Sequence, residues 1–496
     1  MRRSLLVALQ SQAGPNIATT WAPNYRELKF LQWSSSVSID RRVRLEKTAQ
    51  LGYDLKANEN IPNGTVLLEI PPTIWKVFSA KSCVEEIKSS FPEIYHQLTS
   101  AGAIYLPAAN RNTLHEASSI ALKLMTSSEN GQPYAQLLQS SSYPEDMKAV
   151  PHPLLMPDHT FLTPYLQGTI LHSLIKTRQN LYGVIARNLF QDDLIAQHKF
   201  LWAIGTVLSR GVSGKNLPFT MIPIFDFVNH AGATVYNAMK DYDPTRETFQ
   251  LKTIRDVAKD CSVRISYGQA RDNNSFMTIY GFAGNQDFED MKNCDKFSVR
   301  LQLHGESAPG FTFLQQRELR QTFQQFLAQN FSSPTFSAQI VAQDVFFSHR
   351  LFPSPSIDAA SLEPASLPAM EDCQALLGSL LQVIRHLEGL ARERNGQPPL
   401  SAPLPRPGDE VREVLLAHLQ SLLNPQTVAS FSLRSFSPRQ VDTSNADSCL
   451  LTLSQASQDS SPDPLTRWRS SCATVLRMEL LPVFQLLLLT NRGGTV

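Results

Sequence analysis

Met221-Ile-Pro-Ile-Phe-Asp-Phe-Val-Asn-His-Ala231 is the stretch that decides the fold of this chain. An apolar run of strand length, residues 219–225, leads directly into Asp226, Asn229 and His230. Taken alone, an Asn-His pair after a strand indicates only a turn, and a lone histidine is usually structural. The stretch becomes informative only when it is read together with its neighbours in the sequence.

Two neighbouring segments frame this stretch. A predicted helix, residues 194–209, contains Leu201-Trp-Ala and runs on to Leu208-Ser-Arg210. The second segment, Ile265-Ser-Tyr-Gly-Gln-Ala-Arg-Asp-Asn-Asn-Ser-Phe-Met-Thr-Ile-Tyr-Gly-Phe282, contains two Tyr-Gly pairs, with Asn273 before the second. By itself this segment indicates two strand ends with aromatic packing and glycine turns.

In this order and spacing the three segments resemble the SET-domain methyltransferases. The resemblance is to the branch that includes plant Rubisco large-subunit methyltransferase and the actin-histidine methyltransferase. That branch shows Trp-Ala…Ser-Arg, then Pro-x-x-Asp-x-x-Asn-His, then Tyr-Gly…Asn…Tyr-Gly-Phe. The resemblance covers roughly residues 30–290 and is strongest around residues 200–285.

The resemblance implies an α+β fold. We expect a β-rich SET domain with a pseudoknot over residues 21–290, interrupted by a helical subdomain at about residues 80–210. An all-α substrate-binding domain, of the kind found in Rubisco large-subunit methyltransferase, is expected to follow over residues 291–496. From about Phe297 onward the pattern predicts helices with irregular breaks, and residues 435–464 are predicted to be a loop.

The resemblance also implies a function: transfer of a methyl group from S-adenosyl-L-methionine to a lysine amine of a non-histone protein. It assigns cofactor binding to Leu51, Gly52, Tyr53, Arg210, Asn229 and His230. Asp226 is assigned a place near the substrate nitrogen, and Tyr280 is assigned both catalysis and substrate binding.

The chemistry fits these residue types. A free lysine amine has a pKa near ~10.4 and arrives protonated. A dry channel beside a positive sulfonium disfavours the ammonium form, and the phenol of Tyr280 then helps to orient the neutral amine toward the methyl group. We expect no metal in the site, because the transfer needs neither a metal nor an acid–base pair.

Two positions depart from the family pattern. The family has Gly-x-Gly-Leu before the first strand, and Leu51-Gly-Tyr-Asp-Leu55 places Asp54 at the second glycine. Asp reaches left-handed backbone angles less easily than Gly does. The second departure is Ala258-Lys-Asp-Cys-Ser-Val263, where the family has Gly-Glu-Glu or Gly-Glu-Gln; Lys259-Asp260 is still expected to form a turn.

Two alternatives stay open at this point. One is a histidine methyltransferase on the same fold, although the Tyr-Gly-Phe triplet favours lysine. The other is a SET-derived binding protein without catalysis, which Asp54 and the altered turn at Lys259 motivate. A Rossmann-type methyltransferase is disfavoured because no glycine-rich loop joins a strand to a helix. A SET domain with its own zinc cluster is disfavoured because the six cysteines are scattered.

The composition of the chain limits the binding partners and the cellular compartment that we expect. A net charge of +1 and the lack of a Lys/Arg block argue against nucleic-acid binding. No stretch reaches the ~18 apolar residues of a membrane span, and residues 480–489 predict a buried helix. We therefore expect a monomer whose partner is a protein substrate. Residues 1–20 resemble a transit peptide, which implies a chloroplast or mitochondrion; if they are only a frayed terminus, the cytoplasm or nucleus is expected.

Overall fold

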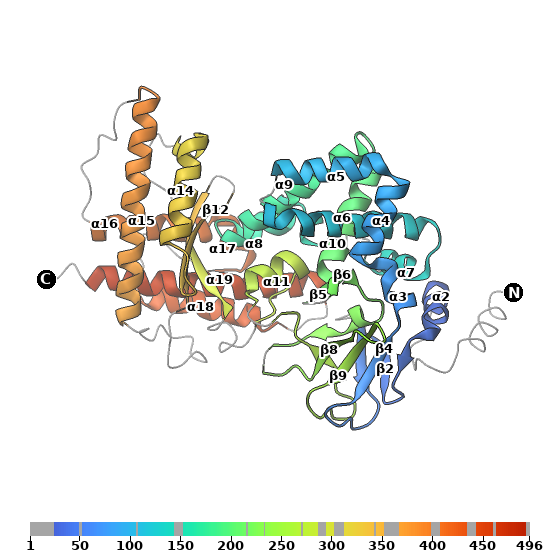
Figure 1. Cartoon of the computed structure of the whole chain (residues 1–496). Helices are drawn as coiled ribbons and strands as arrows, with labels where there is room; N and C mark the ends of the chain where they lie inside the picture. Colours follow the sequence, from blue (N-terminus) through green and yellow to red (C-terminus); the bar gives the residue numbers. More distant parts are fainter. Residues whose placement is uncertain are drawn as a thin grey trace. The chain divides into compact units, whose positions relative to one another are not determined.

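The structure is a computed structural model, and it divides into two compact units (Figure 1). Unit 1 comprises Met1–Leu155, Arg178–Gln269 and Pro462–Pro464, and unit 2 comprises the remaining residues. The residues that the structure describes are 24–48, 52–105, 108–142, 152–214, 217–232, 234–268, 271–285, 294–301, 312–341, 344–351, 367–397, 407–433, 443–459 and 463–492. The expected leader at residues 1–20 lies outside them. The expected domain boundary at residue 290 stays a prediction.

Unit 1 contains a four-stranded sheet. Its strand order is β1-β4-β9-β8, with antiparallel neighbours. These strands are β1 (Ser38–Ile39), β4 (Val66–Ile70), β8 (Ala238–Asp243) and β9 (Thr248–Thr253). The apolar patterns of Val66-Leu-Leu-Glu-Ile70 and Thr248-Phe-Gln-Leu-Lys-Thr253 predict strands, and β4 and β9 have these same bounds.

Three smaller strand pairs also lie among the described residues of unit 1. Strands β2 (Val43–Thr48) and β3 (Gly52–Ala57) pair antiparallel, as do β5 (Gly211–Gly214) and β6 (Leu217–Met221). Strands β7 (Asn229–His230) and β10 (Arg264–Ile265) pair in parallel. The β7–β10 pair joins the two segments on which the family resemblance rests, since Asn229 is opposite Arg264 and His230 is opposite Ile265.

Helices separate β4 from β5 in the sequence. In unit 1 the helical elements, with 3₁₀ turns labelled η, are α2 (Tyr25–Trp33), η1 (Ser34–Ser36), α3 (Pro72–Trp75), η2 (Lys76–Phe78), α4 (Ala80–Ser90), α5 (Pro92–Tyr105), α6 (Ala108–Glu129), α7 (Pro133–Ser142), η3 (Pro153–Leu155), α10 (Leu194–Arg210) and η5 (Phe225–Phe227), together with most of α9 (Ile170–Phe190). Asp193 begins α10 by accepting a hydrogen bond from Ala196 N, and Phe200, Trp202 and Val207 are buried on it.

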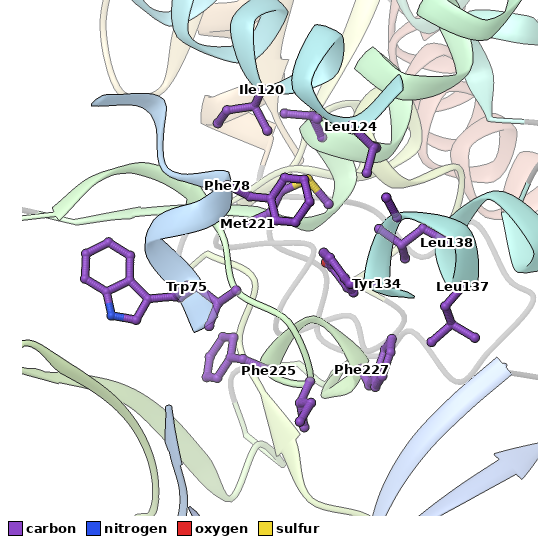
Figure 2. Packing of buried hydrophobic residues seen from close by; sticks show 14 of the residues in the cluster. Trp75, Phe78, Ile120, Leu124, Tyr134, Leu137, Leu138, Met221, Phe225 and Phe227 are labelled. Atoms are coloured by element: carbon purple, nitrogen blue, oxygen red, sulfur yellow. The ribbon is translucent and has the colours of Figure 1, made fainter. Parts of the chain in front are cut away.

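The core of unit 1 packs helices against the strand that leads to the site. Figure 2 shows Phe78, Tyr134, Met221 and Phe227 in this core. The ring of Tyr134, which is fully buried, lies 5.4 Å from that of Phe78. The residues just before Asp226 are therefore held by aromatic and aliphatic packing on several helices.

Unit 2 is mostly helical, which confirms the prediction for the C-terminal half. Its helical elements are η4 (Asp158–Leu162, a π-helical turn), α8 (Thr163–Leu166), α11 (Asn273–Tyr280), α13 (Thr312–Gln315), α14 (Arg317–Asn330), α15 (Leu367–Arg394), α16 (Pro407–Leu422), α17 (Pro425–Ser430), α18 (Thr443–Ser457) and α19 (Pro464–Arg492), with the first turns of α9. The predicted loop at residues 435–464 is wrong over its middle, which forms α18.

Unit 2 also contains a sheet that the sequence did not predict, so this half is not all-α. Strands β11 (Lys296–Leu301), β13 (Asp344–Arg350) and β12 (Phe336–Val341) form an antiparallel sheet in that order. Consecutive residues of β11 and β13 are buried, so these strands lack the alternation by which a half-buried strand is recognised.

The longest helix, α19, lies in the core of unit 2. Among the described residues it alone is long and apolar enough to cross a membrane, with a mean hydropathy of 1.7 over the most apolar 18-residue window within Pro464–Thr490. However, 72% of its most apolar window is buried inside the structure. That burial is typical of a core helix, as the sequence predicted for residues 480–489.

Strand β11 is an edge strand, and side chains from two helices bond to its outer backbone groups. Ser298 N donates to Glu479 Oε2 of α19, and Arg300 N donates to His418 Nδ1 of α16 at 3.2 Å. Glu479 and His418 are both fully buried. The sheet edge is therefore covered rather than open to another strand.

Candidate active site

An arginine, a carboxylate and a phenol form the centre of the site in unit 1. Arg210, at the last position of α10, donates from Nη1 to Asp226 Oδ2 at 3.1 Å and to the Asp226 backbone oxygen at 3.0 Å. The hydroxyl of Tyr134, from α7, donates to the same Oδ2 at 2.8 Å. Asp226 Oδ1 is buried, and no described residue bonds to it. The site thus holds one carboxylate oxygen with two donors and one with none.

Burial governs the ionisation of this group. It raises the pKa of the Asp226 carboxyl, although the guanidinium of Arg210 acts in the opposite direction. It also raises the pKa of Tyr134 well above its usual value, with the charge of Asp226 as the second cause. The phenol of Tyr134 therefore stays protonated and donates its hydrogen bond to the carboxylate.

A strained turn presents Asp226. Ile224 has a φ of 73°, a left-handed value that a β-branched residue rarely adopts. Its side chain is 2% exposed, so packing holds the turn in place. Such strain persists only where the surrounding structure enforces it, and it often marks a functional position.

Asn229 is fixed by the hairpin that carries the N-terminal turn. Its Nδ2 donates to the Tyr53 backbone oxygen at 2.9 Å and to Asp54 Oδ1 at 3.1 Å. Asp54, 1% exposed, also accepts from Arg264 Nη1 at 2.6 Å and from Ser262 Oγ at 2.7 Å. Asp54 lies in the extended strand β3 and not in a left-handed turn, so no glycine is needed at this position.

His230 is held by the second segment. Tyr267 N donates to His230 Nδ1 at 3.1 Å, and the two rings lie 5.3 Å apart. The hydroxyl of Tyr267 donates to the Val228 backbone oxygen at 3.0 Å. The β7–β10 pairing therefore fixes both the backbone and the ring of His230.

The predicted N-terminal turn is described only in part. Leu51 lies outside the described residues, and Gly52 begins β3. The hydroxyl of Tyr53 donates at 2.8 Å to Glu27 of α2, a carboxylate that is 3% exposed. The ring of Tyr53 lies 4.7 Å from that of Phe227, so Tyr53 packs directly beside the segment that carries Asp226.

Tyr280 lies in unit 2 and is the last residue of a helix, so the predicted strand end is wrong. Asp272 caps the start of α11, and Gly281 ends it with a φ of 79°. The Tyr280 ring lies 5.8 Å from that of Phe276, and the guanidinium carbon of Arg271 lies 5.5 Å from its centre. Burial raises the pKa of the Tyr280 phenol. Its convergence with Asp226 stays a prediction, because the two residues belong to different units.

A buried amide network holds both ends of the Tyr-Gly-Phe segment. Asn273 Nδ2 donates to the Asn285 backbone oxygen at 2.9 Å and to Asp295 Oδ2 at 3.0 Å. Asn285 N returns a hydrogen bond to Asn273 Oδ1 at 2.9 Å. The Asn of the sequence motif is therefore a structural residue that closes the loop after Tyr280.

The sequence did not reveal the residues that bond to the predicted site residues. Tyr134 lies 92 residues before Asp226, and no local pattern connects the two. Glu27 was detectable only as a helix-capping residue, three positions after Asn24. No sequence motif marks Arg264, the partner of Asp54, which comes shortly after the turn at residues 258–261. The turn itself forms as expected, with Cys261 N donating to the Ala258 backbone oxygen at 3.1 Å.

Comparison with known proteins supports the fold. No model of a protein family matches the sequence, and no curated protein matches it. Among solved structures, the SET domain of LSMT bound to lysine and AdoHcy matches at 16% identity and a TM-score of 0.52, over 94% of this chain and 90% of that one. Rubisco LSMT bound to sinefungin and monomethyllysine matches at 17% identity and a TM-score of 0.52, with the same coverage. This chain therefore has the fold of the Rubisco LSMT structures, a SET domain with a C-terminal helical region.

Proposed function

We propose that this protein transfers a methyl group from S-adenosyl-L-methionine to a lysine amine of another, non-histone protein. Two neighbouring features within a SET fold carry the proposal. Arg210 pairs with the buried Asp226, and Asn229 and His230 follow on β7, which the β7–β10 pairing holds. The structures with this fold are of a protein bound to AdoMet, to AdoHcy or to lysine.

The residues fit such a cofactor. S-adenosylmethionine carries an ammonium, a carboxylate and an adenine, which need hydrogen-bond donors and acceptors of fixed direction. Arg210 supplies donors that are not all used by Asp226, since only its Nη1 bonds there. Asn229 and His230 are each fixed by a partner, so they add polar groups without mobile side chains.

The lysine assignment rests on Asp226 and Tyr280. Asp226 Oδ1 is an acceptor that lacks a partner among the described residues, and a lysine amine is a donor. Tyr280 keeps its phenol protonated because burial raises its pKa, so the hydroxyl can orient a neutral amine. These two roles require that the units bring both residues to one passage, which is part of the proposal.

A labelling experiment tests the function. Cell extract is incubated with S-adenosylmethionine labelled in its methyl group and with the wild type or Tyr280→Phe. Tyr25→Phe is the control, since that phenol is 52% exposed and distant in sequence from all three motifs. We expect the wild type and the control to label a discrete protein band, and Tyr280→Phe to label it at least about tenfold more slowly.

Amino-acid analysis of the labelled band identifies the acceptor. Methyl-lysine supports the proposal, whereas methyl-histidine would replace lysine with imidazole as the substrate group. Equal labelling by the wild type and Tyr280→Phe would remove Tyr280 from the mechanism. Failure of the wild type to bind the cofactor in a direct titration would refute the function altogether and favour a non-catalytic binding protein.

A further inference from the structure

We infer that Asp54, the residue that breaks the glycine pattern, is a positioning residue that locks the side-chain amide of Asn229 in one orientation. The inference rests on the proposed function, because the locked amide is assigned to cofactor recognition. Asp54 and Asn229 are joined by one hydrogen bond of 3.1 Å, although they lie 175 residues apart in the sequence.

The lock follows from counting donors. An asparagine amide has two N–H donors and one acceptor oxygen. Asn229 Nδ2 donates to the Tyr53 backbone oxygen and to Asp54 Oδ1, so both of its N–H groups are used. The flipped amide would place Oδ1 against two acceptors and would lose both bonds.

The charge of Asp54 is itself held in place. Arg264 Nη1 donates at 2.6 Å to the oxygen that accepts from Asn229, and Ser262 Oγ donates at 2.7 Å to the other oxygen. A hydrogen bond to a charged acceptor is stronger than one to a neutral acceptor. The buried carboxylate of Asp54, paired with the partly exposed guanidinium of Arg264, therefore gives the amide a charged anchor.

One consequence concerns the ligand. Among the residues that the structure describes, none donates a hydrogen bond to Asn229 Oδ1. The locked amide thus offers only an acceptor, and the matching ligand group is a donor. The donors of S-adenosylmethionine and its product are the α-ammonium, the ribose hydroxyls and the adenine amino group. We assign the α-ammonium to Asn229 Oδ1, because a charged donor forms the strongest of these hydrogen bonds.

Binding of S-adenosylhomocysteine, measured by isothermal titration calorimetry, tests the lock without knowledge of the protein substrate. The second ligand is the same molecule without its α-amino group. In the wild type we expect removal of the amino group to weaken binding at least about tenfold. In Asp54→Ala only the bond to the Tyr53 backbone oxygen still opposes a flip of the amide, so we expect S-adenosylhomocysteine to bind about tenfold more weakly and the difference between the two ligands to shrink.

The ratio of the two dissociation constants separates orientation from general damage. A merely structural loss at position 54 would weaken both ligands equally and leave the ratio unchanged, and that result would overturn the inference. Glu46→Gln is the matched control, because Glu46 lies opposite Asp54 on the same hairpin and pairs with Lys56 at 2.9 Å. It should keep the wild-type ratio.

Two further outcomes are decisive. If Asp54→Ala does not fold, as judged by thermal unfolding, Asp54→Asn takes its place; it keeps an acceptor oxygen but not the charge, and an intermediate ratio is expected. If the wild type does not bind S-adenosylhomocysteine at all, the proposed function fails. If the wild type binds and both variants keep its ratio, only the role of Asp54 fails.

Discussion

Replacing Glu479 with glutamine is expected to remove a pH dependence from the stability of unit 2. Glu479 lies on α19 and is fully buried, and its Oε2 accepts from Ser298 N at the edge of the sheet. Burial raises the pKa of this carboxyl to about 8, from a usual value of 4.5. Glutamine has the shape of the protonated acid and retains an acceptor for Ser298.

The sign and size follow from linkage. The folded protein binds the Glu479 proton more tightly than the unfolded chain does, so this contribution to stability is complete below pH 4.5 and is lost as the pH rises to about 8. Burial lowers the pKa of His418, the other residue at this edge, from 6.5 to about 3. The contribution of His418 to stability therefore rises with pH below pH 6.5, which is opposite to the change that Glu479 causes. Between pH 6.5 and 8 only Glu479 of this pair acts, and its loss amounts to about 2 kcal/mol.

Urea unfolding followed by circular dichroism at pH 6.5, 7.2 and 8 measures this loss. We expect the free energy of unfolding of the wild type to fall by about 2 kcal/mol more over this range than that of Glu479→Gln. The control is Glu413→Gln on α16, whose carboxylate is 61% exposed and should change nothing. Parallel pH curves for the wild type and Glu479→Gln would refute the reasoning.

Three further predictions concern packing and turns. Asp260→Val should lower the free energy of unfolding by about 1–2 kcal/mol, because Asp260 has a φ of 63° that a β-branched residue adopts poorly; an unchanged urea midpoint would contradict this. Gly284→Ala should lower the melting temperature by several degrees, since the new Cβ would lie 2.6 Å from the ring of Phe276; a melting temperature equal to that of the wild type would show that the ring gives way. Tyr134→Phe should cost about 1–3 kcal/mol in urea unfolding, because it removes a hydrogen bond from the buried carboxylate of Asp226; a cost near zero would mean that water replaces the phenol.

The sequence predicts those parts of the fold that have a simple period or a compact motif. Strand β9 and helix α10 were found because their apolar residues recur at the spacing of a strand and of a helix. Asn229 and His230 were selected as candidate site residues because their motif is short and continuous. Strands β11 and β13 were missed because both of their faces are buried and the periodic signal is lost.

Tyr280 illustrates a local misreading. The eight residues of α11 end in Thr-Ile-Tyr, which favours a strand, yet Asp272 and Gly281 are good helix start and stop signals. The partners of Asp226 illustrate a limit of another kind. Tyr134 reaches Asp226 only after α7 and the turn at Ile224 have packed together, and that contact follows from tertiary structure alone.

The way in which the chain alternates between the two units has a consequence for biosynthesis. Residues 156–177 belong to unit 2 although they precede Arg178–Gln269 of unit 1, and α19 in the core of unit 2 is the last helix described. Once residue 269 has left the ribosome, a nascent chain can therefore form all of unit 1 except Pro462–Pro464, whereas unit 2 must wait for α19. Until then the apolar surfaces that α19 covers stay exposed, and chaperones are expected to engage the nascent chain at this stage.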